Sequence, residues 1–335
     1  MPDLAPARRA AVFAAALVAL AVAVVLSLMI GRQVLAPGTV VHELFTATGS
    51  QAGGIVRGLR LERTVVAVVV GLALGGAGAL MQALTRNPLA DPGLLGVNAG
   101  AAAAVVTGVA LFGISSQHAQ LWLALVGAAA ASVVVYAIGT GGRGTTTPAR
   151  LALAGAALSA VLVSWMNGLA LRDQQTYDTM RHWVVGSVVN RGLDTLAQAL
   201  PFLLVGAVAA LVVTPGLNAL ALGEDTGRSL GLSVPRTRIL TAVAVTLLCG
   251  AATAVAGPIG FVGLTVPHVA RFAVGTDQRA VVPLSMLLAA TVLVLADTVG
   301  RVVTSGREIE VGVMTALLGA PVFVALVRHR RLVAL

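Results

Sequence analysis

Long apolar runs separated by short polar joins form the dominant pattern along this chain. An α-helix needs about 20 apolar residues to cross roughly 30 Å of hydrocarbon. Runs of this kind lie at 10–31, 62–84, 93–113, 119–139, 149–171, 193–213, 236–256, 280–303 and 309–328. A shorter apolar stretch at 257–273 contains Pro258 and Pro267, and without a crossing there Arg279 and Arg301 would exchange sides of the membrane. The pattern therefore predicts an all-α polytopic membrane protein with ten transmembrane helices.

Composition agrees with this class. Of 335 residues, 58% are hydrophobic and 10% are charged, whereas soluble domains carry roughly 25% charged residues. The 38 glycines would let helices approach closely in lipid. Gly71-x-x-x-Gly75 and Gly96-x-x-x-Gly100 match that pattern, although a chain rich in glycine and alanine also produces it by chance. The single Cys249 excludes an internal disulfide and is expected to be a small core residue.

All 22 basic residues are arginines, and they give a formal net charge of +9. A phosphate-binding P-loop needs a lysine, so the chain is not expected to hydrolyse ATP by a Walker-type site of its own. The arginines are scattered between apolar runs, which argues against nucleic-acid binding. Arginine outside the spans instead fixes membrane topology, because cytoplasmic loops carry an excess of positive charge.

An even number of spans places both termini on one side of the membrane. The arginines of the two ends make that side cytoplasmic: Arg8, Arg9, Arg328, Arg330 and Arg331. Thirteen arginines then lie inside and nine outside, a weak bias. The outer arginines suggest a further use, and for Arg60 and Arg63 at the mouth of a span, docking of an acidic partner and plain solvated charge are equally open.

Few ionisable groups lie within the spans, where such groups are functional by default. Asp297 is the only acid well inside a predicted apolar run. The histidines at 42, 118, 182, 268 and 329 are isolated and have no metal-ligand spacing. No nucleophile–base pair stands out. A membrane enzyme and an ion-coupled carrier are therefore poorly supported, no metal or cofactor is expected, and a transport pathway driven by another source fits better.

The cytoplasmic connection "NALALGEDTGRSLGLSVP" at 218–235 is long and joins the sixth and seventh spans. It predicts a short amphipathic helix that ends at Gly231 as a C-terminal cap. Its apolar side would comprise Leu220, Leu222, Leu230 and Leu232. Such a helix could seat in a groove of a partner protein or lie on lipid, and the pattern favours neither.

Five longer motifs carry a resemblance to a known family. They are "RLERT" at 60–64, "GALMQALTRNPLADPGLLGVNAGA" at 78–101, "LALGEDTGRSLGL" at 220–232, "GPIGFVGLTVPHVAR" at 257–271 and "EIEVGVMTALLGAPVF" at 308–323. In this order they resemble the permeases of iron-chelate, haem and cobalamin uptake, the transmembrane subunits of type II ABC importers. The resemblance covers essentially all of residues 1–335, which it implies to be a single permease domain in the bacterial inner membrane.

The resemblance implies an importer of metal chelates by alternating access, with a ferric siderophore as first choice and haem or cobalamin as alternatives. Two permeases, either a homodimer or two related chains, would surround the pathway. Two separate cytoplasmic ATP-binding subunits and an extracytoplasmic substrate-binding protein would complete the assembly. A secondary carrier, which would work without an ATPase, and a scaffold that moves no substrate are the rivals from other classes.

Site residues follow from the same resemblance. The cytoplasmic gate would comprise Asn87, Pro88, Leu89, Thr147 and Pro148, and the ATPase coupling residues would be Gly223, Glu224, Gly227, Arg228 and Gly231. Binding-protein docking would use Arg60, Arg63 and Arg301, and the pathway lining would include Asn98, Ser159 and Asn167. Two acidic residues, Glu62 and Glu310, replace prolines of the family pattern near the docking face. Because Pro88 and Pro92 fix φ and lack a donor, both helices beside the gate loop should stop there.

Overall fold

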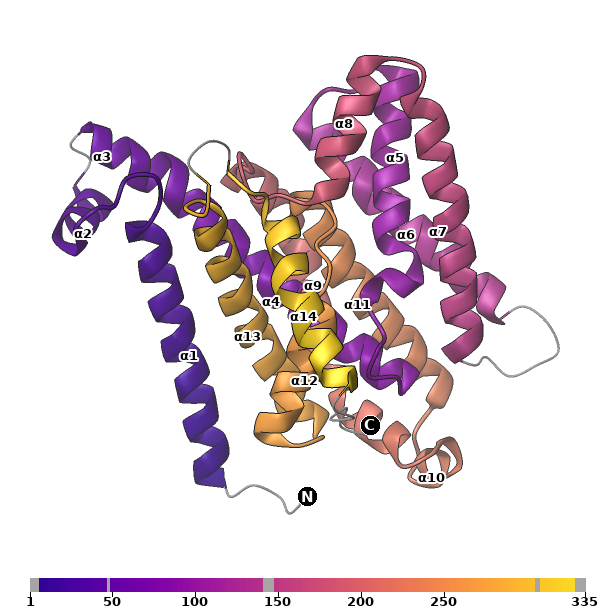
Figure 1. The fold of residues 1–335 in the computed structure, drawn as a ribbon. Coiled ribbons are helices and arrows are strands. Elements are labelled where there is room, and N and C mark those ends of the chain that lie inside the picture. The colour runs from indigo at the N-terminus through magenta and orange to yellow at the C-terminus, as the bar shows by residue number, and fades with distance from the viewer. Residues whose placement is uncertain (1–5, 47–48, 141–147, 305–307, 329–335) are drawn as a thin grey trace.

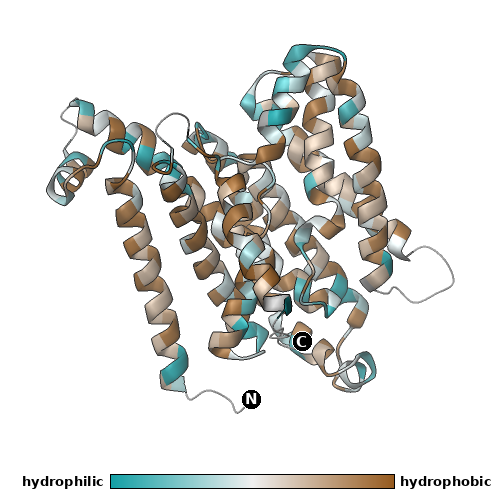
Figure 2. Ribbon diagram, in the orientation of Figure 1, coloured by the Kyte–Doolittle hydropathy of each residue, from teal (hydrophilic) through white to brown (hydrophobic). Residues whose placement is uncertain are grey.

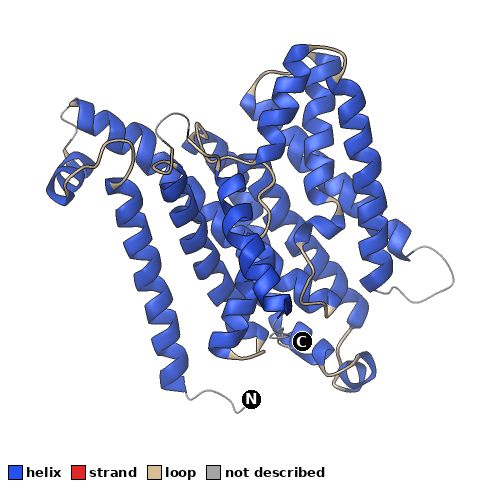
Figure 3. Cartoon of the chain, in the orientation of Figure 1, coloured by secondary structure: helices blue, strands red, loops and turns tan. Residues whose placement is uncertain are grey.

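The computed structural model describes residues 6–46, 49–140, 148–304 and 308–328, and within these ranges every regular element is a helix (Figure 3). The longer helices are α1 (Pro6–Met29), α4 (Glu62–Thr85), α5 (Val97–Phe112), α6 (Gln117–Thr140), α7 (Pro148–Ala170), α9 (Leu193–Ala221), α11 (Val234–Ala256), α12 (Val262–Val274), α13 (Gln278–Gly300) and α14 (Val311–Arg328). The shorter elements are α2 (Pro37–Phe45), α3 (Gln51–Gly53), the π-helical η1 (Gly54–Leu61), the 3-10 turn η2 (Pro92–Leu95), α8 (Gln174–Val185) and α10 (Glu224–Ser229).

Each predicted apolar run coincides with one of the longer helices. In the described ranges seven helices are long and apolar enough to cross a membrane: α1, α4 with the segment before it, α6, α7, α9, α11 and α13. Shorter apolar helices are α5, α12 and α14. Figure 2 shows apolar colour along the helices and hydrophilic colour gathered toward their ends, as expected for a protein that crosses lipid.

The core centres on α4, which packs against α11, α12 and α13. Of its apolar window, 78% is buried, compared with 67% for α11 and α13 and between 22% and 33% for α1, α6, α7 and α9. Close approach depends on missing side chains, because a Cβ at Gly71 would lie 2.5 Å from Cα of Ala290, and one at Gly75 would lie 2.3 Å from the Ser285 carbonyl oxygen. The pattern Gly71-x-x-x-Gly75 therefore marks a close crossing of α4 and α13.

A second group of helices, α5 to α8, stands beside this core (Figure 1). Its tightest crossing is between α5 and α6, where a Cβ at Gly100 would lie 2.4 Å from the Gly127 carbonyl oxygen. Gly100 belongs to the second small-residue pattern, so that pattern also marks a helix contact.

The two ends of the bundle differ. In Figure 1, α10 and the α12–α13 connection lie at one end, and α2, α3 and α8 lie at the other. The α10 end is fastened by Asp277, whose carboxylate accepts a hydrogen bond from Asn218 Nδ2 at 2.6 Å and pairs with Arg9 at 3.6 Å. Three helices, α1, α9 and α13, therefore meet at one side chain.

One predicted boundary is wrong. The sixth run was expected to stop at 213 and its connection to begin at 218, but α9 continues to Ala221. Pro215 inside the helix lacks the N–H that would reach the Leu211 carbonyl, and the Thr214 hydroxyl donates to that carbonyl instead at 2.8 Å. A neighbouring Thr side chain thus satisfies the backbone that the proline leaves free, and the helix persists.

Candidate functional site

The loop that contains the predicted gate residues, residues 86–96 and named the gate loop for that prediction, begins where α4 ends. Arg86 adopts a left-handed conformation with φ 49°, and its N–H donates to the Ala83 carbonyl at 3.4 Å. The Asn87 N–H donates to the Gln82 carbonyl at 3.2 Å. This pair of bonds is the Schellman pattern, which glycine usually closes. A non-glycine residue in this conformation costs about 1–2 kcal/mol, so the end of α4 stores strain at the first residue of the loop.

Short-range hydrogen bonds then hold the loop in one shape. Asn87 Oδ1 accepts from the Leu89 N–H at 2.9 Å, and its carbonyl accepts from the Ala90 N–H at 3.0 Å. Asp91 Oδ1 accepts from the Gly93 N–H at 2.8 Å and caps η2. Burial raises the pKa of the Asp91 carboxyl, an effect opposed by that hydrogen bond. The expectation that both flanking helices stop at this loop is confirmed.

Two long-range contacts anchor the same loop. Arg86 Nη2 donates to the Leu220 carbonyl at the end of α9, directly before α10. The Pro88 carbonyl lies 2.9 Å from Nε2 of His268 on α12. Leu89, the residue after Pro88, remains 42% exposed. The loop is therefore bonded on one side to the coupling segment, residues 218–235, and on the other to α12.

Only one residue of the second predicted half of the gate lies within the described ranges. Thr147 lies outside the described residues, and Pro148 is the first residue of α7. The α7 helix nevertheless touches the gate loop, because a Cβ at Gly155 would lie 1.8 Å from the Leu94 carbonyl oxygen. The assignment of all five residues to a gate stays a prediction.

The coupling segment contains the predicted short helix, α10. Gly223 precedes it with φ 112°, a conformation that favours glycine. Glu224 accepts hydrogen bonds from Arg238 on α11 and, at 3.4 Å, from Arg228. Arg228 also pairs with Asp225 at 3.2 Å. Glu224 thus joins α10 to α11, while Arg228 stays on the surface with 60% of its side chain exposed.

The end of α10 confirms the predicted glycine cap. Gly231 has φ 83°, its N–H donates to the Arg228 carbonyl at 2.9 Å, and the Leu232 N–H donates to the Gly227 carbonyl at 3.0 Å. These are the two bonds of the Schellman motif. The helix is therefore stopped by a residue whose backbone conformation strains any other side chain.

The four leucines of this segment do not form one apolar face. Leu220 is buried and Leu232 packs against the core, whereas Leu222 and Leu230 are each 67% exposed. The exposed pair lies on either side of α10.

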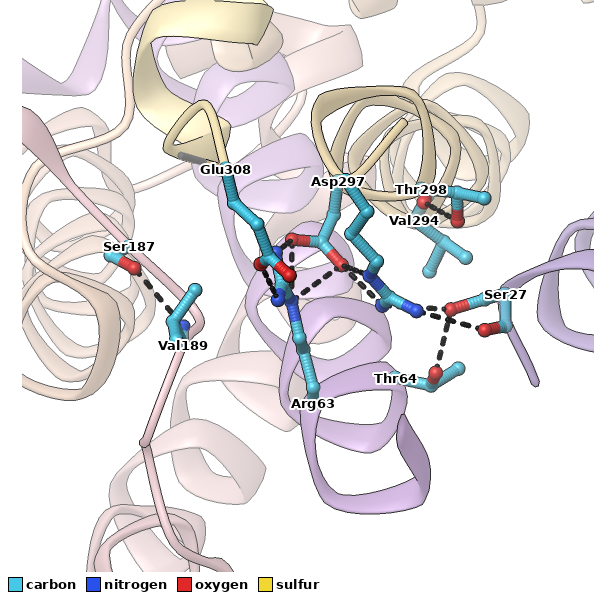
Figure 4. A network of polar contacts seen from close by, with 10 residues as sticks. Ser27, Arg63, Thr64, Ser187, Val189, Val294, Asp297, Thr298 and Glu308 are labelled. Atoms are coloured by element: carbon cyan, nitrogen blue, oxygen red, sulfur yellow. Dashed lines mark hydrogen bonds and ion pairs between the residues drawn. The ribbon is translucent and has the colours of Figure 1, made fainter. Parts of the chain in front are cut away.

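Figure 4 shows a charged network at the opposite end, centred on Asp297 of α13. Arg63 of α4 donates to this carboxylate from Nε at 2.8 Å and from Nη2 at 2.6 Å, and its Nη1 donates to Glu308 at 2.5 Å. Arg301 donates to Asp297 from Nε at 3.0 Å and to the Ser27 carbonyl of α1 at 2.8 Å. Two guanidinium groups therefore share one fully buried carboxylate.

Arg60, the third predicted docking residue, caps α1. Its Nη1 donates to the Leu28 and Met29 carbonyls at 2.8 and 2.9 Å, and its Nη2 donates to the Gln33 carbonyl. The last carbonyls of a helix have no partner within the helix and carry partial negative charge, so a guanidinium group suits them well.

The docking arginines thus lie together at one end of the bundle but are engaged within the chain. Arg60 and Arg301 are 6% and 4% exposed, and the Arg63 side chain is 10% exposed. Buried charge is costly unless it is paired, which explains the dense bonding. Their role in docking stays a prediction.

The three predicted pathway residues lie on two helices, and their role in lining a pathway stays a prediction. Asn98 of α5 faces α11, where its Oδ1 accepts from the Thr253 hydroxyl at 2.9 Å and lies 3.5 Å from Sγ of Cys249. Ser159 and Asn167 lie on α7, half-buried and exposed respectively. Asn98 therefore acts between two helices, and only the α7 residues lie on a weakly covered helix.

A buried polar group beside the gate loop was not predicted from the sequence; it is formed by Gln82, His268 and Arg271. His268 was interpreted as isolated because no metal-ligand partner lies near it in sequence. The signal was available, since two polar residues three positions apart in the apolar motif 257–271 would share one helix face.

Comparison with known proteins identifies relatives over nearly the full length. Residues 19–329 match the model of the FecCD transport family. The chain is 48% identical over 315 residues to the ferric enterobactin transport system permease protein FepD of Escherichia coli (strain K12), covering 94% of each chain. It is 39% identical to the Fe(3+)-citrate import system permease protein YfmD of Bacillus subtilis (strain 168), covering 86% of this chain and 85% of the relative.

A solved structure supports the fold. The chain superposes on an inward-facing metal-chelate type ABC transporter with a TM-score of 0.83 at 26% identity, covering 96% of this chain and 99% of the other. The helix arrangement described above is therefore shared with a transporter whose structure is known.

Proposed function

Because the chain belongs to the FecCD transport family, we propose that it forms the membrane pathway of an ABC importer for a ferric siderophore. Permeases of this family are multi-pass proteins of the cytoplasmic membrane and work with a separate ATPase and a binding protein. The observation that carries the proposal is the bond from Arg86 to the Leu220 carbonyl. It joins the gate loop directly to the segment that would receive the ATPase.

The substrate is proposed from the relatives. FepD is named for ferric enterobactin and YfmD for Fe(3+)-citrate, both complexes of iron with an organic chelator. A ferric siderophore is the best match to these names. Haem and cobalamin, the alternatives implied by the sequence motifs, become competitors in the test.

Ten crossings with both termini in the cytoplasm complete the proposed topology. The seven long apolar helices and the three shorter ones supply ten candidates in the described ranges. An even number places α10 and both chain ends on one side, in agreement with the arginines of the termini. The Asp297 network then lies on the outer side, where the substrate-binding protein would dock.

The proposed work cycle uses α10 as the contact with the ATPase. Leu222 and Leu230 supply exposed apolar surface beside Arg228, and Glu224 passes a displacement of α10 to Arg238 on α11. Rigid connections of this kind can carry a movement between two sites when the connected elements have two arrangements. ATP hydrolysis in the partner subunits would then move the gate loop, alternately closing and opening the inner side of a pathway between two permeases.

Docking of the binding protein is proposed at the Arg63 side of the network. Glu308 is the more exposed of the two carboxylates that Arg63 contacts, with 32% of its side chain accessible. An acidic group of the partner could therefore take its place on the guanidinium without disturbing Asp297. The accessibility of Glu308 supports a docking role for an arginine that is otherwise buried.

The test is transport by the full complex in proteoliposomes. The chain, its paired permease if a second one is required, the ATPase and the binding protein are reconstituted, and accumulation of radiolabelled ferric enterobactin is measured. Uptake should require ATP and the binding protein, and excess haem or cobalamin should not compete. Uptake that persists without the ATPase, driven by a proton or sodium gradient, would instead identify a secondary carrier.

A further inference from the structure

A continuous chain of polar contacts runs through the buried core beside the gate loop. Arg271 Nη2 donates to Gln82 Oε1 and lies 3.2 Å from Nδ1 of His268. His268 Nε2 in turn lies 2.9 Å from the Pro88 carbonyl oxygen. Gln82, His268 and Arg271 are all fully buried. The contacts link α4, α12 and the gate loop.

The donor and the acceptor in each of these polar contacts can be assigned from chemistry alone. A guanidinium group only donates, so His268 Nδ1 must present its lone pair to Arg271. The ring proton therefore sits on Nε2 and is donated to the Pro88 carbonyl. Without the Arg271 donor, the ring proton could also sit on Nδ1, and that tautomer cannot donate to the Pro88 carbonyl.

Gln82 connects these polar contacts to α12 at the turn that its internal proline interrupts. Pro267 lacks the N–H that would reach the Gly263 carbonyl. Gln82 Nε2 donates at 3.0 Å to the Leu264 carbonyl and at 3.4 Å to the Gly263 carbonyl. The side chain from α4 therefore covers the backbone that the proline leaves open, and α12 is held at the height of the gate loop.

Stability does not explain Arg271. Its side chain is fully buried, yet Nε and Nη1 have no hydrogen-bond partner among the described residues. A buried cation with unused donors is costly, and an apolar side chain of similar volume is often as stable or more so. What Arg271 does supply is the one donor that orients both Gln82 and His268.

We propose that His268, oriented by Arg271 and Gln82, is a positioning residue that makes the gate loop follow α12 through the Pro88 carbonyl. The inference rests on the proposed function of this loop as a gate. Helix α12 is bounded by residues with positive φ, Phe261 at 66° and Gly275 at 83°, which interrupt the helical backbone at both ends. A shift of α12 would draw Pro88 and its neighbour Leu89 with it.

The experiment reads the position of Leu89. Cys249 is the only cysteine of the chain and is buried, so a Cys249→Ala, Leu89→Cys variant carries one reactive thiol at the loop. The complete transporter, assembled with its ATPase, is labelled with a membrane-impermeant maleimide from the cytoplasmic side. Rates are compared without nucleotide and with ATP plus vanadate, and transport by the reporter variant is measured first.

Two substitutions at one position separate bonding from packing. His268→Gln places an amide N–H near the site of Nε2 and should keep the labelling rates near those of the reporter. His268→Asn keeps a partner for Arg271 but cannot reach the Pro88 carbonyl. It should raise the labelling rate in the closed state, the more slowly labelled of the two conditions, by about fivefold, the effect of one lost hydrogen bond. The labelling rate should also depend less on nucleotide. Arg271→Met should act in the same direction and replaces His268→Asn if that variant does not assemble.

The outcomes separate the two proposals. If labelling of the reporter itself does not change with nucleotide, residues 86–96 are not a gate. If it does change, but His268→Asn and His268→Gln behave alike, the loop is a gate and His268 does not position it. Equal loss of thermal stability in both variants, with unchanged labelling, would likewise show that the buried group only packs.

Discussion

Neutralising Asp297 tests the charged network most directly. In the Asp297→Asn variant the side chain keeps its size, but Arg63 and Arg301 lose the carboxylate that both contact through Nε and Nη2. Glu308 remains on Arg63 only. Removing one partner of a buried ion pair costs about 3–5 kcal/mol because the remaining charge is left uncompensated. We expect the Asp297→Asn change to lower the free energy of unfolding by an amount in this range.

A matched control is the next residue along α13. Thr298 is also buried, and its hydroxyl donates to the Val294 carbonyl one turn earlier. Thr298→Ala removes one neutral hydrogen bond and should cost about 1 kcal/mol. Combining Asp297→Asn with Arg301→Met should recover part of the loss, because the second change removes a stranded cation.

The measurement is thermal unfolding of the purified permease in detergent, followed by the fluorescence of its three tryptophans. Scan rates must be identical, because unfolding of such proteins is often irreversible. Asp297→Asn should lower the midpoint by on the order of 5–10 °C, and Thr298→Ala by a small fraction of that. Equal midpoints for the two variants would mean that water solvates the arginines, and the account of a buried shared carboxylate would be wrong.

Three further predictions concern function. Arg86→Gly and Arg86→Ala both remove the bond to the end of α9, so both should weaken substrate-stimulated ATPase activity. The glycine variant should be more stable than the alanine variant by about 1 kcal/mol, because glycine accepts the left-handed conformation. Equal ATPase stimulation in wild type and both variants would contradict the link. Gly231→Val should distort the end of α10 and uncouple ATP hydrolysis from uptake while the protein still inserts, and normal stimulation in proteoliposomes would refute this. Glu308→Gln should release Arg63 and strengthen binding-protein docking by up to about fivefold, the upper value for an exposed pair, whereas Glu62→Gln changes the same charge without touching Arg63; identical effects in a binding titration would show that only net charge matters.

The long helices could be predicted because each crossing leaves its own signal in the sequence. Roughly 20 consecutive apolar residues are required whatever the neighbours do, and all the predicted runs are helices. The helix α8 was missed because half of it is polar, although Asp173 followed by Thr176 was a usable cap signal: the Asp173 carboxylate accepts from the Thr176 N–H at 2.8 Å. The end of α9 was misplaced because a hydroxyl replaced the hydrogen bond lost at Pro215.

The candidate site was predictable only where its geometry is local. The prolines of the gate loop and the glycine after α10 act on their immediate neighbours. Both predictions of where the helices stop are confirmed. The bonds that give the loop its meaning are not local, since Arg86 reaches a residue 134 positions away and Pro88 one 180 positions away. No spacing rule connects such residues, so the contact between His268 and the Pro88 carbonyl could not be predicted from the sequence.

The attachment of α1 has a consequence for how the protein is made. This helix packs mainly against α13, and its last turn is held by Arg60 and by Arg301. Arg60 leaves the ribosome soon after α1, but Arg301 is 274 residues behind Ser27, which corresponds to roughly 15–55 s of synthesis at 5–20 residues per second. For most of translation α1 must therefore wait in the lipid as a single span with only its cap in place. Helix α1 therefore reaches the membrane long before α13, the helix against which it packs most.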